Sequence, residues 1–277
     1  MAHLVESAWT PGSRVSLQEV LFDLWEIYVA LEAPTEPEVA EDRRWYVGGL
    51  PRPTTFPFGP IRVLGNRAYV VGYSDQLRSP VWSAYRVGGE KQRLASAAPR
   101  PDRFLVDRRL SSPVMPQDYS SSGFDRGHLA PNLAIGLWFG AEAQRETFLM
   151  SNVVPQRPAL NSGIWRALES RLAVNYPARF EEIWVLCGPV FSRDPERLPK
   201  GGVAIPREFF LIVVDRTDGR LRAQTFLIPQ SQPRSDGRAQ YLHSIDEVEL
   251  RSGLDFFPDL ADLVEAQFEA SVSRRVW

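Results

Sequence analysis

Three apolar runs typical of β-strands follow one another in the second half of this 277-residue chain. They are EIWVLCGPVF, EFFLIVVDR and RAQTFLIPQ. Two earlier runs, RAYVVGYS and PVWSAYRV, are separated by the turn-like DQLRSP and predict a hairpin or two consecutive strands. Because strands and helices come in clusters rather than in strict alternation, we expect an α+β fold with a largely antiparallel sheet.

Helices are expected between and after these strands. The segment LNSGIWRALESRLAVNY places Ile164, Leu168 and Leu172 on one stripe, as an amphipathic helix would. It follows ETFLMSNVVPQ, which has the pattern of a strand ended by proline. Another helix is predicted to begin near Ser244, where SIDE has the spacing of a capping box.

The N-terminal region has a different character. Ser16 and Glu19 have capping-box spacing and open an amphipathic helix predicted over residues 16–34. PTEPEVAEDRR then has the composition of a linker. We therefore expect a helical extension with its linker in residues 1–44 and a main domain in residues 45–277. The helix is a candidate contact for a second copy, an inhibitor or an effector, although packing on the main domain is the commoner fate of such a face.

Composition limits the classes of partner and location. The formal net charge of −2 does not indicate a polyanionic partner, so any nucleic-acid-binding surface would have to be a local patch of basic side chains. A single cysteine, Cys187, in an apolar run predicts a buried thiol and excludes an intrachain disulfide. Without a bilayer-spanning run or a signal-peptide pattern, we expect no membrane contact. The chain as written predicts a cytoplasmic protein, or an exported one if a longer precursor precedes it.

The segment GFDRGHLAPN places three ionic side chains within four residues at the end of a long irregular loop. His128, a neutral imidazole near pH 7, suits a general base, and Arg126 suits an anionic substrate. Asp125 could orient a neighbouring donor, and Gly127 permits a close approach that a Cβ would forbid. These four residues together suit an enzyme that promotes nucleophilic attack on an anionic ester. Taken alone, however, such an aspartate and arginine more commonly form a local ion pair, next to a histidine whose hydrogen bonds are made within the protein.

The segment that follows favours a catalytic interpretation of this motif, because it carries further polar residues, Asn152, Gln156, Asn161 and Glu169. Magnesium prefers oxygen ligands and keeps several waters, so Asn161 could bind it while Glu169 acts through water. On a straight α-helix their Cα atoms would lie about 12 Å apart. Either Glu169 acts through water, which we favour, or Asn161 lies in an entry turn where NSG bends the chain. Singly, Asn161 is more commonly a cap or turn residue and Glu169 a solvated helix charge.

The two ordered motifs, FDRGHLAPN and FLMSNVVPQ leading to LNSGIWRALE, resemble those of the sugar-non-specific DNA/RNA endonuclease family of ββα-metal nucleases. A weaker likeness covers roughly residues 45–260 and leaves the N-terminal helix outside. The resemblance implies a ββα-metal nuclease domain that cleaves DNA and RNA with little sequence preference and depends on Mg²⁺. Mn²⁺ suits the same oxygen ligands.

The resemblance also implies roles for individual residues. It makes His128 the general base, Asn161 the protein ligand of Mg²⁺, Glu169 a catalytic residue acting through the metal's water, Asn152 a neighbour of that water shell, and Arg126 a phosphate-side arginine. Asp125 and Gly127 are supporting residues. Arg103 is the candidate for an upstream substrate-binding arginine, although its spacing does not match the family cleanly. Where the family carries an arginine one helical turn after the glutamate, this chain has Ala173.

The main alternative is a catalytically silent nucleic-acid-binding module of the same fold. Loss of the histidine or the metal asparagine would be its signature, and this chain keeps both. A zinc hydrolase is disfavoured because His3 and His243 are isolated and the sequence has no HExxH motif or Cys/His cluster. A serine hydrolase is disfavoured because the sequence has no Gly-x-Ser-x-Gly elbow.

Overall fold

The computed structural model describes residues 45–277 apart from 55–57, 90–92, 218 and 233–236. The helix predicted over residues 16–34 and the boundary predicted near residue 44 lie outside the described residues and stay predictions. None of the described helices is both long and apolar enough to cross a lipid bilayer.

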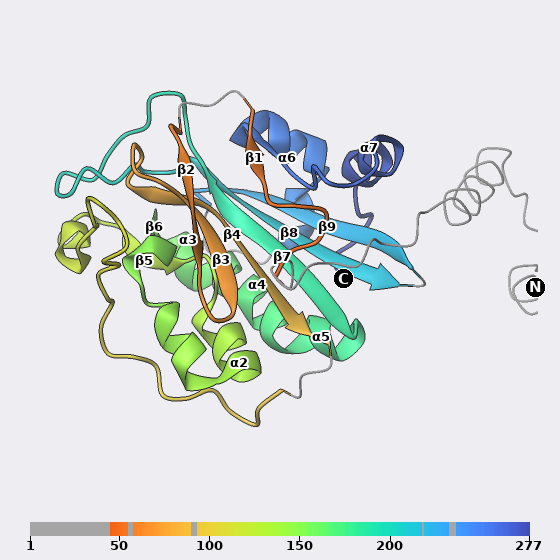
Figure 1. The fold of residues 1–277 in the computed structure, drawn as a ribbon, viewed down its shortest axis with the longest axis horizontal. Helices are drawn as coiled ribbons and strands as arrows, with labels where there is room; N and C mark the ends of the chain where they lie inside the picture. The colour runs from red at the N-terminus through yellow and green to blue at the C-terminus, as the bar shows by residue number, and fades with distance from the viewer. Residues whose placement is uncertain (1–44, 55–57, 90–92, 218, 233–236) are drawn as a thin grey trace, which may run out of the picture. The chain divides into compact units, whose positions relative to one another are not determined.

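A seven-stranded antiparallel sheet in the order β10-β9-β8-β7-β4-β3-β2 forms the centre of the described region (Figure 1). Its strands are β2 (Ile61–Gly65), β3 (Tyr69–Ser74), β4 (Ser79–Gly88), β7 (Glu182–Val190), β8 (Glu208–Thr217), β9 (Arg220–Pro229) and β10 (Leu242–His243). The expected hairpin is confirmed as the β3–β4 pair, and the three later runs are confirmed as the neighbours β7, β8 and β9. The fold is therefore α+β, as the clustering of strands predicted.

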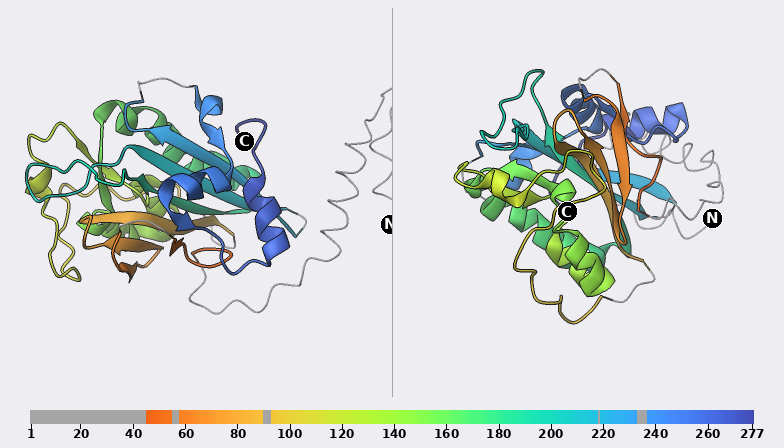
Figure 2. Two further views of the ribbon diagram at one scale, coloured as in Figure 1. Left: turned by 90° about the horizontal axis from the view of Figure 1, so that it is seen from above. Right: turned by 60° about the vertical axis from the view of Figure 1, so that its left-hand side comes forward.

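Helices cover both faces of this sheet, as the views in Figures 1 and 2 show. On one face lie α2 (Asn132–Glu146), α4 (Arg166–Ser170) and α5 (Tyr176–Arg179), and on the other lie α6 (Ile245–Ser252) and α7 (Asp262–Ala270). A strand covered on both faces needs apolar side chains in both directions. This explains why Ile183 to Val190 of β7 form a continuous buried run rather than an alternating one.

The helical segment predicted over residues 160–176 is confirmed, with an irregular backbone. It passes through α3 (Pro158–Leu160), the π-helical turn η4 (Asn161–Trp165), α4, a second π-helical turn η5 (Arg171–Asn175) and α5. Ile164, Leu168 and Leu172 are buried, as their common stripe predicted. Gly163 departs from helical geometry with φ −100° and ψ −116°, so this segment does not begin as a straight α-helix.

Near the motif-bearing loop, β5 (Asp125–His128) and β6 (Val153–Gln156) form a separate antiparallel pair. The strand expected throughout ETFLMSNVVPQ is too long, because Met150–Asn152 form the short 3₁₀ turn η3. Side-chain bonds hold this turn: the Ser151 hydroxyl donates to Asp107, and the Asn152 amide bonds to neighbouring backbone. Pro155 lies inside β6 rather than ending it, which a short two-stranded pair tolerates.

Short elements complete the described chain. They are β1 (Arg52–Pro53), which pairs with β11 (Leu254–Asp255), and the 3₁₀ turns η2 (Pro116–Tyr119) and η6 (Arg238–Tyr241). The helix predicted near Ser244 is α6, and the Ser244 hydroxyl accepts a hydrogen bond from the backbone N–H of Glu247.

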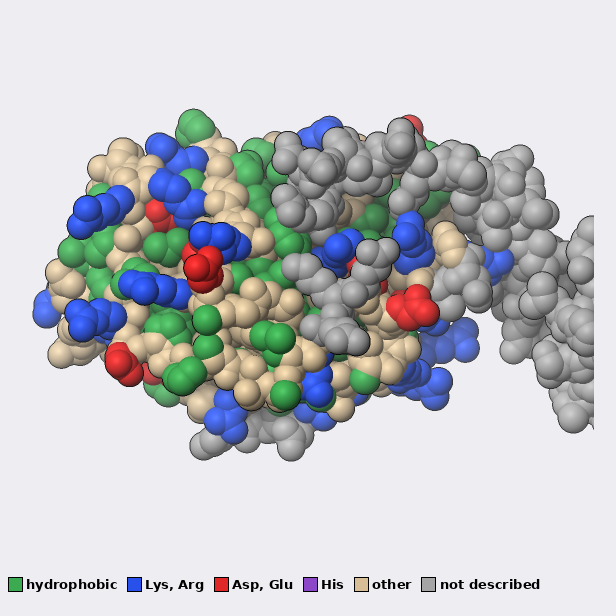
Figure 3. Space-filling model, turned by 60° about the horizontal axis from the view of Figure 1, so that its bottom comes forward, with side chains coloured by type: hydrophobic (Ala, Val, Ile, Leu, Met, Phe, Trp, Pro, Cys, Tyr) green, Lys and Arg blue, Asp and Glu red, His purple; other side chains and the backbone are tan. Residues whose placement is uncertain are grey.

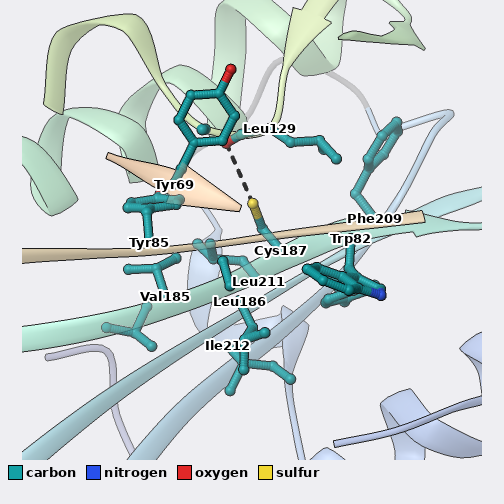
Figure 4. Close-up of a cluster of buried hydrophobic side chains, with 14 of the residues drawn as sticks. Tyr69, Trp82, Tyr85, Leu129, Val185, Leu186, Cys187, Phe209, Leu211 and Ile212 are labelled. Carbon is teal, nitrogen blue, oxygen red and sulfur yellow. Dashed lines mark hydrogen bonds between the residues drawn. The ribbon is translucent and has the colours of Figure 1, made fainter. Parts of the chain in front are cut away.

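The main core cluster extends over the central sheet and the helices on both of its faces, and Figure 4 shows the part of it around β7. Cys187 of β7 is fully buried, as predicted, and burial raises the pKa of its thiol well above the usual range. Its Sγ donates a hydrogen bond of 3.3 Å to the carbonyl of Leu129, the residue after His128. The central sheet thus supports the chain directly behind the motif histidine.

Candidate active site

The DRGH motif forms the whole of β5, so its side chains alternate between two faces. On one face, Arg126 and His128 both contact Phe104: the Arg126 Cζ lies 5.7 Å and the His128 ring 5.2 Å from the phenyl centroid. On the other face, Asp125 accepts a hydrogen bond from Asn161, and Gly127 lies against Gln156. Strand β5 therefore carries a cationic, aromatic face and an amide-lined face.

His128 is 8% exposed and packs beside Phe104 and Phe148, whose rings also contact each other, with the Phe148 centroid 4.8 Å away in an edge-on arrangement. Burial, reinforced by the positive charge of Arg100, lowers the pKa of His128 to about 3. The imidazole is therefore neutral at pH 7. Its Nε2 is buried and has no hydrogen-bond partner among the described residues. A buried polar atom without a partner is costly, and such atoms mark places where water or a ligand binds.

Two arginines flank this histidine through the same rings. The Arg100 Cζ lies 4.9 Å from the Phe148 centroid, and its charge acts on both His128 and Glu169. Arg126 donates from Nε and Nη2 to the carbonyl of Pro116 at 3.0 and 2.8 Å, which fixes the plane of its guanidinium. A guanidinium has five N–H donors, so the contact with Pro116 leaves other N–H groups of Arg126 available.

The Asn161 amide is oriented by Asp125, since its Nδ2 donates to Asp125 Oδ2 at 2.9 Å. Asn161 opens the π-helical turn that contains the non-helical Gly163, so the bent entry turn considered from the sequence is present. This geometry does not test the water-mediated role of Glu169, which stays a prediction.

Glu169 lies farther along the same helical segment and is partly buried. Burial raises the pKa of its carboxyl to about 8, against the opposing effects of Arg100, Trp165 and Arg166. Carboxylates with raised pKa values in partly buried sites are candidates for functional groups. Asp125, Asn161 and Glu169 offer only oxygen donors, the ligand chemistry that suits Mg²⁺ or Mn²⁺, so these residues fit the expected metal.

Asn152 has a different environment from the one expected from the sequence. It is fully buried, and its Oδ1 accepts from the backbone N–H of Ala130 at 2.9 Å. Its Nδ2 donates to the carbonyls of Ala130 and Thr147, both at 2.9 Å. These contacts hold the backbone after His128 to the end of α2, a positioning role. Its predicted place in the metal's water shell stays a prediction.

Gly127 is explained by the close approach of Gln156. A Cβ on Gly127 would lie 2.1 Å from Gln156 Oε1, well inside contact distance. Gln156 is fully buried, and its two amide atoms have no hydrogen-bond partner among the described residues. The sequence singled out both residues but did not indicate that they touch.

The sequence analysis missed Arg100, Phe104 and Phe148. All three lie outside the DRGH motif, and only the folded chain brings them to His128. The sequence candidate Arg103 is exposed in the same loop as Arg100, and its role in substrate binding stays a prediction.

Comparison with known proteins gives a consistent result. Residues 53–263 match the DNA/RNA non-specific endonuclease family. The mitochondrial nuclease EXOG of Xenopus laevis is 30% identical over 208 residues, which are 69% of this chain and 57% of the frog protein. Human mitochondrial endonuclease G is 28% identical over 73% of this chain and 71% of its own length. The nuclease of Serratia marcescens is 26% identical over 73% of this chain and 77% of its own.

A solved structure shares the fold. A chain in the crystal structure of the EndoG/EndoGI complex superposes with a TM-score of 0.69 at 22% identity. The match covers 82% of this chain and 95% of that one.

Proposed function

The chain belongs to the DNA/RNA non-specific endonuclease family, and on that premise we propose that it is a metal-dependent endonuclease that hydrolyses phosphodiester bonds of DNA and RNA. The observation that carries the proposal is the state of His128: a neutral imidazole whose buried Nε2 has no partner among the described residues. Such a nitrogen can accept a proton without first losing another bond.

His128 acts as the general base. Its imidazole takes a proton from a water molecule as the water oxygen bonds to phosphorus and the ester P–O bond breaks. A pKa of about 3 makes the isolated imidazole a weak base. The negative charge of a bound phosphate would raise this pKa, because an opposite charge nearby favours the protonated ring. Substrate binding therefore increases the basicity of His128 when it is needed.

Arg100 and Arg126, which lie over the two phenyl rings that contact His128, bind the phosphate. Their charges stabilise the extra negative charge of the pentacovalent phosphorus. Asn161 is the protein ligand of the metal, Glu169 acts on the same site through water, and Asp125 orients the Asn161 amide. When bound, Mg²⁺ supplies positive charge for the phosphoryl and departing oxygens.

Substrate recognition depends on phosphates rather than on bases. Figure 3 shows Lys and Arg side chains spread over the side of the molecule that carries α2, with few Asp and Glu side chains among them. Backbone phosphates are shared by DNA and RNA of every sequence, so such contacts bind without sequence preference. This accounts for a nucleic-acid substrate in a chain of net charge −2.

The test is to incubate plasmid DNA and a structured RNA with wild-type protein, His128→Ala and the matched control His243→Ala, in Mg²⁺, in Mn²⁺ and in excess EDTA. We expect wild type and His243→Ala to cleave both substrates only with metal. His128→Ala should be slower by about 10²–10⁴-fold, the usual contribution of a general base.

Two results would contradict the proposal. His128→Ala could cleave at the wild-type rate, or wild type could leave both substrates intact with each metal. Binding of the same nucleic acids without cleavage would instead identify the silent binding module. The helix predicted over residues 16–34 remains the candidate contact for an inhibitor or a second copy.

A further inference from the structure

Three carboxylates converge at a second place, between α6 and α7. Asp246 and Glu249 come from α6, and Glu269 comes from the last turn of α7. One ligand oxygen from each lies within 4.8 Å of the other two. The two helices lie side by side in both views of Figure 2, on the opposite face of the sheet from α2. The convergence is therefore produced by packing and is separate from the DRGH site.

Glu269 is the member of this group that requires an explanation. Its side chain is 6% exposed, and its Oε1 is buried without a hydrogen-bond partner among the described residues. A buried carboxylate without a partner is strongly unfavourable. Its place near the C-terminus of α7 adds to the cost, because that end of a helix dipole is negative.

Neighbouring charges increase the need for a cation. Burial, reinforced by Glu249 and other carboxylates, raises the pKa of Glu269 to about 9. Burial also raises the pKa of Glu249 to about 7, although its Oε1 accepts a 2.7 Å hydrogen bond from the backbone N–H of Phe256.

Two arginines near these helices bind carboxylates outside the group. Arg251 binds Glu247 and Glu208, and Arg52 binds Asp259. When ionised, the three clustered carboxylates therefore repel one another, and neither of these guanidinium groups forms an ion pair with them.

The spacing of the oxygens indicates which cation would relieve this repulsion. Calcium binds oxygens at about 2.3–2.6 Å, so two ligands of one ion lie up to about 5 Å apart. The three oxygens all lie within 4.8 Å of one another, which is compatible with this range. Magnesium usually keeps several waters and binds through only one or two carboxylates, whereas three converge here.

We propose that Asp246, Glu249 and Glu269 form a second cation site that binds Ca²⁺ and joins α6 to α7. Water completes the coordination, since Ca²⁺ takes six to eight oxygens in flexible geometry. The site stabilises the C-terminal helices rather than acting in phosphodiester cleavage.

The test uses the full chain in an Asn161→Ala background, which removes the proposed ligand of the catalytic metal. Thermal unfolding and calorimetric titration with CaCl₂ are compared in this background and after adding Glu269→Gln or Glu249→Gln. The control is Glu265→Gln, which makes the same substitution in α7 but lies outside the three ligands. We expect Ca²⁺ to raise the melting temperature of the background and of the control. Glu269→Gln should lose this rise, and Glu249→Gln should bind Ca²⁺ at least about tenfold more weakly.

Measurements in EDTA keep the test independent of misfolding. There, Glu269→Gln should melt at or close to the temperature of its background, because Glu269 with a pKa of about 9 is protonated in the metal-free protein and glutamine is an uncharged side chain of similar size. A large loss of stability in EDTA would overturn the proposal, as would an equal Ca²⁺ response with and without Glu269→Gln. Absence of Ca²⁺ binding to the folded background protein would also overturn it. In a chain with Asn161 intact, Glu269→Gln should cleave DNA in Mg²⁺ like wild type, so the nuclease proposal is tested separately.

Discussion

Asn161 donates a 2.9 Å hydrogen bond from its amide nitrogen to Oδ2 of Asp125, 36 residues earlier in the chain. The bond joins the π-helical turn η4 to β5 and uses the nitrogen end of the amide. A hard cation would bind the other end, the carbonyl oxygen. Asp125 thus fixes which atom Asn161 presents, which gives physical content to the supporting role expected from the sequence.

Asp125→Ala should weaken the affinity for the metal more than it lowers the maximal rate of cleavage. Without the carboxylate, the Asn161 amide can rotate, and loss of a group that orients a metal ligand typically costs about 10–100-fold in affinity. The measurement is the Mg²⁺ concentration for half-maximal cleavage. Asp102→Ala, an exposed aspartate in the preceding loop, is the control. An unchanged Mg²⁺ requirement in Asp125→Ala would refute the orienting role.

Arg100→Ala should slow cleavage by at least about tenfold, because it removes a charge placed to stabilise the phosphorane. Arg100 also lowers the pKa of Glu169, so its removal raises that pKa further. If ionised Glu169 is required, the acid limb of the pH–rate profile moves to higher pH in this variant. Arg103→Ala, in the same exposed loop, is the matched comparison. Normal activity in Arg100→Ala with a large loss in Arg103→Ala would return the phosphate role to the residue chosen from the sequence.

Asn152→Ala should lower the free energy of unfolding of the protein. The substitution removes one accepted and two donated hydrogen bonds in a fully buried place. Leaving those backbone groups unsatisfied should lower the free energy of unfolding by about 2–5 kcal/mol. Urea unfolding measures this loss, with the exposed Asn175→Ala as control. Wild-type stability combined with lost activity would instead place Asn152 at the metal.

Elements that bury a continuous or periodic apolar pattern were predictable. The runs that became β7, β8 and β9 are apolar along almost their whole length, and the stripe of Ile164 and Leu168 repeats every four residues. Pattern alone identifies such elements because burial selects for it. The N-terminal boundary of β6 was less predictable, since side-chain hydrogen bonds from Ser151 and Asn152, rather than strand propensity, determine where the strand begins.

The motif residues were predictable for their chemistry, whereas their partners were not. Arg100 lies in a long loop without periodicity, and nothing local indicates that its guanidinium lies over Phe148. Glu269 is likewise about twenty residues from Asp246 and Glu249 and meets them only through the packing of α7 on α6. Contacts between distant segments depend on the whole fold, which no local pattern encodes.

The buried His128 should make the protein sensitive to acid. Its folded pKa of about 3 lies below the unfolded value of 6.5, so only the unfolded chain binds this proton between those pH values. Its contribution to stability is complete above pH 6.5 and is lost as the pH falls toward 3, by about 1.5 kcal/mol between pH 6.5 and pH 5. Glu169 and Glu269 have raised pKa values and act in the opposite direction, since they favour the folded state as the pH falls.

Comparison with His128→Asn isolates the histidine from those carboxylates, because both proteins share them. Free energies of unfolding from urea titrations at pH 6.5, 5.8 and 5.0 should show a steeper loss in wild type than in His128→Asn. The difference between the two slopes is the contribution of one proton, at most about 1.4 kcal/mol per pH unit. Parallel slopes would mean that the imidazole takes up its proton in the folded protein. In that case His128 is hydrated, and a base with an ordinary pKa replaces the desolvated one in the mechanism.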